Sequence, residues 1–211
     1  MEQQFYKSTG ISLSVGSLLA IVTMILHPSG GNIMEIVKQA EILKVSHSIA
    51  IICLPFMLFG FYGLSKSLSE NRKLSTLALV IVAFGLFAAM LAALFNGIIL
   101  PSFLSKNLDV LEESKKTISV IVSYGFSINK ALDYVFIVSL IAAIGLYSWL
   151  MIRLKNRFSL IGYFGMIILL LTLISLVLNF AITSLFGFRF FVFSITVWIL
   201  LSGFSLIKTK N

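Results

Sequence analysis

The sequence predicts an all-α integral membrane protein, a six-transmembrane-helix bundle with two short amphipathic helices on its outer face. Hydrophobic residues make up 59% of the chain and charged residues only 11%, which is too little polar surface to cover a soluble core. Several apolar runs approach or exceed the length of about 20 residues that crosses a bilayer as a helix. These runs are continuous rather than alternating, which disfavours a membrane β-barrel. We expect residues 1–211 to form a single polytopic domain.

The apolar runs define six expected spans. Lys7 precedes the first run, and no small-x-small cleavage pattern follows that run before His27, so we interpret it as a retained span rather than a signal peptide. Pro28 and the glycines after it are expected to end this span. The spans are expected at about 9–27, 45–64, 75–100, 131–152, 159–182 and 188–207.

The two amphipathic helices are expected between spans one and two and between spans three and four. Asn32 and Glu35 have the spacing of a capping box, and apolar residues recur at helical spacing from Ile33 to Leu43. The stretch from Phe103 to Thr117 alternates leucines with charged residues and follows Pro101, which we expect to close span three. Both stretches are interpreted as helices at the membrane interface or in solvent.

Three spans carry features that predict their packing. Pro55 should kink the second span. Gly85, Ala89, Ala93 and Gly97 form a four-residue-spaced stripe in the third span, and small residues at this spacing let helices approach closely, so we expect this helix at the centre of the bundle. The apolar segment 118–152 would be roughly 50 Å long as a helix, against a bilayer core of about 30 Å. It is expected to protrude or to break near Gly125.

The distribution of Lys and Arg gives an expected orientation. The termini and the loops on their side carry nine Lys or Arg and two acidic residues, whereas the other side carries seven and six. Positive loops favour the cytoplasm. We therefore expect both termini in the cytoplasm, in what would be a bacterial inner (plasma) membrane, with the amphipathic helices outside.

Polar residues within the spans gather toward the outer side of this topology. Intramembrane polar groups are costly and usually face the bundle interior or a wet cavity, so an outward-opening ligand pocket is one interpretation. The alternative is structural, because side chains near the interface reach water easily and Asp133 could pair with Lys130 or Arg189. The candidate ligand-binding residues are His27, His47, Asn96, Asp133, Asn179 and Arg189.

The sequence leaves open which cofactor, if any, the protein binds. His27 and His47, on adjacent antiparallel segments, could bind a haem iron axially or supply two ligands to a divalent metal such as zinc or copper, with Glu35, Glu41 or Asp133 as a further ligand. The pair matches no metal-site motif. The single cysteine, Cys53, allows neither an intrachain disulfide nor a thiolate cluster.

Three functional classes remain open. The first is a protein, enzymatic or not, whose outward pocket binds a small ligand, a lipid headgroup, haem or a metal, with His47 as the expected acid–base group or ligand. The second is a non-enzymatic accessory, immunity or scaffold subunit, and the third is a small secondary transporter or channel. Expected partners are the lipid bilayer and another copy or a partner membrane protein. Nucleic acid is not expected, because the net charge of +8 fits topology-setting loops.

Overall fold

The computed structural model describes residues 2–28, 32–68, 71–107, 115–156, 158–178 and 184–208. Within these residues the regular structure is helical, and six helical segments are long and apolar enough to cross a membrane. The all-α membrane class and the six spans are thereby confirmed. The elements are α1 (Glu2–Leu26), α2 (Ile33–Lys38), α3 (Ala40–Ser67), α4 (Arg72–Ala92), the π-helix η2 (Ala93–Ile99), α5 (Leu100–Lys106), α6 (Lys115–Arg153), α7 (Phe158–Val177) and α8 (Leu185–Ile207).

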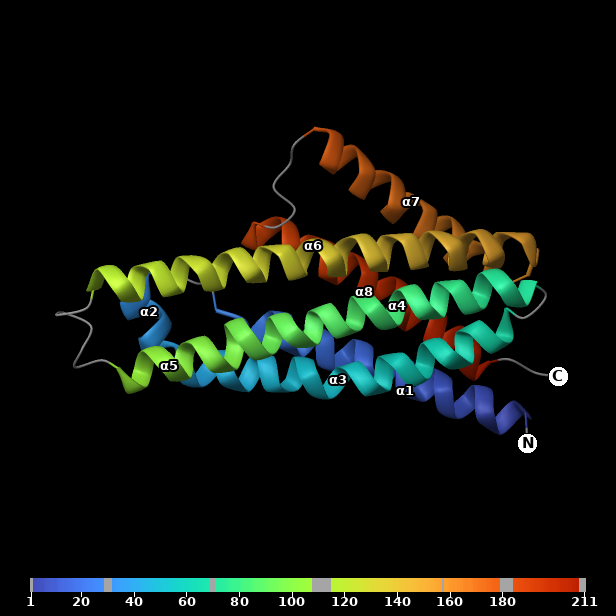
Figure 1. The fold of residues 1–211 in the computed structure, drawn as a ribbon. Helices are drawn as coiled ribbons and strands as arrows, with labels where there is room; N and C mark the ends of the chain where they lie inside the picture. The colour runs from blue at the N-terminus through green and yellow to red at the C-terminus, as the bar shows by residue number, and fades with distance from the viewer. Residues whose placement is uncertain are drawn as a thin grey trace.

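The helices form an elongated bundle with two different ends (Figure 1). Both chain termini lie at one end, which we call the terminal end, and α2 and α5 lie at the other, which we call the cap end. Helix α1 packs on α3 and α8, α4 packs on α6 and α3, and α7 contacts α6 and α8. The chain therefore brings its first and last spans together.

Close helix contacts concentrate toward the terminal end. A Cβ on Gly63 would lie 2.1 Å from Thr9 Oγ1, and one on Gly10 would lie 2.7 Å from the carbonyl oxygen of Gly203. Only glycine lets these backbones approach so closely, as small residues do in membrane interfaces generally. The largest fully buried side chains, including Phe61, Tyr147 and Trp198, fill the core between the helices.

The cap end has a hydrophobic cluster of its own. Asn32 and Glu35 form the expected capping box at the start of α2, but the amphipathic stretch is divided at Gln39, after which α3 begins. The second amphipathic stretch is split between the end of α5 and the start of α6, and residues 108–114 lie outside the described residues. Apolar faces of α2, α3, α5 and α6 meet here through Ile36, Leu43, Leu100, Leu104, Ile118 and Val122.

One expected helix boundary is wrong. Pro101 does not end the third span, because the helix continues through η2 and α5 to Lys106. Proline normally clashes with the carbonyl four residues earlier, but Pro101 lies in the first turn of α5, directly after the π-helical segment, whose hydrogen bonds are offset by one residue. Pro55 lies inside α3, within the expected second span.

The fourth span is longer than its expected membrane part, 131–152. Helix α6 has 39 residues, or about 58 Å at 1.5 Å per residue, and does not break at Gly125. The apolar run therefore protrudes, and its first turns carry Ile118 and Val122 into the cap cluster. Tertiary packing at the cap explains why so long a helix stays continuous.

Candidate functional site

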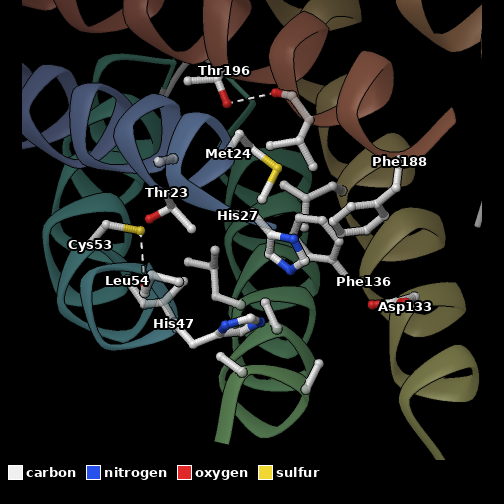
Figure 2. Close-up of a pocket in the computed structure, with 18 of the residues that line it drawn as sticks. Thr23, Met24, His27, His47, Cys53, Leu54, Asp133, Phe136, Phe188 and Thr196 are labelled. Atoms are coloured by element: carbon white, nitrogen blue, oxygen red, sulfur yellow. Dashed lines mark hydrogen bonds between the residues drawn. The ribbon is translucent and has the colours of Figure 1, made fainter. Parts of the chain in front are cut away.

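A cavity of about 310 Å³ lies inside the bundle toward the cap end (Figure 2). Five of the six spanning segments line it: α1, α3, α4 with η2, α6 and α8, whereas α7 contributes none of its lining residues. One part of the lining is polar and the other is apolar. The polar part includes His27, His47, Asn96, Asn129 and Asp133, and the apolar part includes Met57, Leu86, Leu140 and Ile199.

The polar part lies at the membrane boundary opposite the terminal end. At the terminal end, Lys66 lies over the ring of Tyr62 and Arg153 over that of Trp149, which is typical of an interface. His47 precedes Lys66 by 19 residues and Asp133 precedes Arg153 by 20, so each lies roughly 30 Å from that interface, the thickness of the hydrocarbon core. The cavity thus has a polar mouth at one membrane surface and an apolar floor within the membrane.

The two histidines are in contact at this mouth. Their ring centroids lie 4.8 Å apart with the planes tilted by 57°. The Nδ1 of His27 is 2.8 Å from the carbonyl oxygen of Pro28, and the Nδ1 of His47 is 2.8 Å from that of Leu43. A carbonyl only accepts hydrogen bonds, so Nδ1 carries the proton in both rings. In each neutral ring Nε2 is therefore a free acceptor, and within the described part of the chain neither Nε2 has a hydrogen-bond partner.

Arg189 holds the segment that carries His27. Its guanidinium donates a hydrogen bond to the carbonyl oxygen of His27, which ties the end of α1 to the first turns of α8. Burial lowers the pKa of His27, the bond to the Pro28 carbonyl opposes this shift, and the charge of Arg189 adds to it. Arg189 thus positions His27 and favours its neutral form.

The small-residue stripe of the third span shapes the cavity. At one end of it, a Cβ on Gly85 would lie 2.5 Å from Leu140 Cδ2, so this glycine permits close contact with α6. At the other end, a Cβ on Gly97 would lie 1.9 Å from Cγ of His47, so this glycine makes room for the imidazole. Between them, Ala89 and Ala93 line the open space. The stripe therefore supports packing at its ends and a cavity in its middle.

The remaining polar groups of the mouth also offer acceptor oxygens. Asp133 accepts a hydrogen bond from the amide nitrogen of Asn129 at 2.9 Å. Within the described residues no cation lies at ion-pair distance from Asp133, since Lys130 is exposed and the ion pair found joins Lys44 to Glu41. The Oδ1 atom of Asn96 is buried without a hydrogen-bond partner, which is costly and requires an explanation.

Four of the six expected site residues, His27, His47, Asn96 and Asp133, line this one cavity. Arg189 is not among the lining residues, and Asn179 lies outside the described residues. Sequence reasoning missed Asn129, whose spacing of four from Asp133 was the available signal. It also missed the sulfur-containing and aromatic lining, Met24, Cys53, Phe136 and Phe188, which carries no sequence signal distinct from ordinary core.

The histidine pair does not fit a haem or a closed metal site. Axial ligation from opposite faces, with each nitrogen about 2 Å from the metal, would separate the ring centroids by about 6 Å with a porphyrin between them, and the rings are closer than that. Structural zinc takes four protein ligands and catalytic zinc three. Among the described residues no group of three His, Cys, Asp or Glu side chains could hold an ion. The free Nε2 atoms of the two rings can instead accept hydrogen bonds.

Comparisons with protein-family models, with curated proteins and with solved structures find no match to this chain.

Proposed function

We propose that this chain is a membrane-embedded binding protein for a single-chain amphiphile, whose polar head lies among the residues of the mouth and whose tail fills the apolar floor. The observation that carries the proposal is the cavity itself, which is polar at one membrane boundary and apolar toward the membrane interior. Ligand pockets are mostly apolar with a few polar groups that fix orientation. The lining matches this pattern.

The dimensions of the floor support a tail of moderate length. From His47 to Met57 the lining extends over ten residues of α3, or about 15 Å. Successive carbons of an extended alkyl chain advance by about 1.3 Å, so a dodecyl chain matches this depth. The bias of Lys and Arg toward the terminal end favours an orientation with cytoplasmic termini and a mouth that faces outward from a bacterial plasma membrane.

Native mass spectrometry of the detergent-purified full chain would test the proposal directly. Dodecylamine, dodecanol and dodecanoate serve as probes, and we expect at least one of them to bind at one copy per chain. Ala89→Phe places a ring in the cavity and should abolish this binding, with Ala93→Leu as a second blocking variant. Ala142→Phe is the matched control, because Ala142 is exposed on α6. The proposal fails if no probe binds the wild type or if both blocking variants bind as well as the control.

A further inference from the structure

The hydroxyl and thiol groups of the cavity lining already donate their protons within the protein. The hydroxyl of Thr23 donates to the carbonyl of Leu19 at 3.0 Å, and the hydroxyl of Thr196 donates to that of Val192 at 2.6 Å. The thiol of Cys53 points its proton at the carbonyl of Ala50 at 2.9 Å. These bonds stay within one helix, two of them visible as dashed lines in Figure 2. Each group therefore presents lone pairs, and not a proton, to a ligand.

The mouth adds stronger acceptors to this lining. The Nε2 atoms of His27 and His47 and the buried Oδ1 of Asn96 have no partner within the described residues. A buried acceptor without a partner costs free energy that a donor from a ligand would recover. The amide nitrogen of Asn129 is a donor, but it is directed to Asp133. The amide nitrogen of Asn96 also lines the cavity as a donor, but it is outnumbered by these acceptors, so the lining favours a polar head that brings donors.

A carboxylate and two aromatic rings at the cavity indicate which kind of polar head the ligand carries. Asp133 contributes a carboxylate that no cation neutralises within the described chain. One turn further along α6, Phe136 lines the same cavity, and its ring centroid is 6.1 Å from that of Phe188. A cation is attracted both to a carboxylate in a poorly solvated site and to aromatic faces. An anionic head would instead face this carboxylate, because the positive charge of Arg189 does not line the cavity and its guanidinium is directed to the carbonyl of His27.

We infer that the head of the ligand is a protonated amine, so that the natural ligand is a cationic amphiphile with N–H donors. This inference rests on the proposed function and names its substrate class. The ammonium donates to His27, His47 and Asn96 and pairs with Asp133, while the tail occupies the floor. The same chemistry is offered by a free long-chain amine or by the ethanolamine head of a single-chain phospholipid.

A series of dodecyl probes that differ only in the head group tests the inference. We expect dodecylamine to bind about tenfold more tightly than dodecanol, as for a charge-assisted hydrogen bond replacing a neutral one, and dodecanoate to bind most weakly. Dodecyltrimethylammonium keeps the charge but lacks N–H donors, so it should bind more weakly than dodecylamine. Equal affinity for amine, alcohol and carboxylate, with binding still blocked by Ala89→Phe, would refute the amine while leaving the proposed function intact.

A substitution at Asp133 provides a second test of the inference. Asp133→Asn should remove most of the tenfold preference for dodecylamine over dodecanol, because the ammonium loses its charged partner. Glu41→Gln is the matched control, because Glu41 is exposed on α3 and does not line the cavity, and its preference should equal that of the wild type. A preference that survives Asp133→Asn would overturn the role of the carboxylate and with it the inference.

The lipid and the free amine are distinguished by a dodecanoyl lysophosphatidylethanolamine probe. Its phosphate adds acceptors to a lining in which acceptors already predominate, so we expect it to bind more weakly than dodecylamine. Tighter binding than dodecylamine, lost in Asp133→Asn, would support the amine head and assign it to the phospholipid. Tighter binding that is unchanged in Asp133→Asn would show that the phosphate is recognised and would refute the inference.

Discussion

The two halves of the bundle differ in whether their hydroxyl groups also bond between helices. In the terminal half, Ser14 and Ser17 donate within α1, but other hydroxyls bond to another helix. Ser12 donates to the Phe56 carbonyl of α3, and Ser65 donates to the Ser75 carbonyl of α4. Around the cavity, Thr23 and Thr196 donate only within their own helices. Hydrogen bonds between helices hold a bundle together, whereas a hydrogen bond within one helix does not attach that helix to its neighbour. The hydroxyls of the cavity half therefore keep their lone pairs available for another molecule.

Glycine at the terminal end should give the largest effect on stability. Gly63→Ala would put a methyl group within 2.3 Å of Thr9 Cβ, so α1 and α3 must separate. We expect a loss of about 1–3 kcal/mol in unfolding free energy, measured by SDS titration of the detergent-solubilised protein and followed by far-UV circular dichroism. Gly125→Ala is the control, since its nearest neighbour would be Leu100 Cδ2 at 3.9 Å and alanine favours the helix. Equal losses in both variants would contradict the close approach of α1 and α3.

Removing the hydroxyl of Ser65 should give the next largest loss of unfolding free energy. It donates to the Ser75 carbonyl at 2.6 Å and contacts the Tyr147 hydroxyl at 2.8 Å, so it joins α3 to α4 and α6. Ser65→Ala leaves both partners buried, and we expect a loss of about 1 kcal/mol in the same titration. Thr196→Val at the cavity removes only a bond within α8 and should cost less than half as much. If the two costs are equal, the contrast between the halves is wrong.

Replacing Asn96 should give the smallest change in unfolding free energy, and this change should be a gain rather than a loss. Its buried Oδ1 has no partner within the described chain, so replacing the amide by an apolar group of similar size removes a penalty. We expect Asn96→Leu to raise the unfolding free energy by up to about 1 kcal/mol while weakening dodecylamine binding severalfold. A loss of stability comparable with that of Ser65→Ala would mean that Asn96 serves the fold and not a ligand.

The sequence was sufficient for the spans and for much of the site, for a physical reason. A bilayer imposes a length and a polarity on each span, so runs such as that ending at Leu26 can be recognised without any tertiary contact. The same rule makes His47 and Asp133 conspicuous, because polar groups are rare at that depth. The capping box of Asn32 and Glu35 is likewise local, since both partners lie within one turn.

What could not be predicted depends on contacts between distant segments. Pro101 lies within a continuous helix because the π-helix before it changes the hydrogen-bond register, and no composition rule predicts that change. The bond from Arg189 to the carbonyl of His27 joins residues 162 positions apart. The positions of Met24 and Phe136 at the cavity depend on how five helices pack together, and an apolar residue in a span carries no mark of whether it faces lipid, core or cavity.

The unbroken helix α6 has a mechanical consequence. Asp133 lies on it at the cavity mouth, and Lys115 begins it 18 residues away, or about 27 Å along the axis. A rigid rod of that length acts as a lever: a tilt of about 10° at the level of Asp133 would move the tip by about 5 Å. The cap cluster, into which this rod is packed through Ile118 and Val122, is therefore mechanically linked to the wall of the cavity.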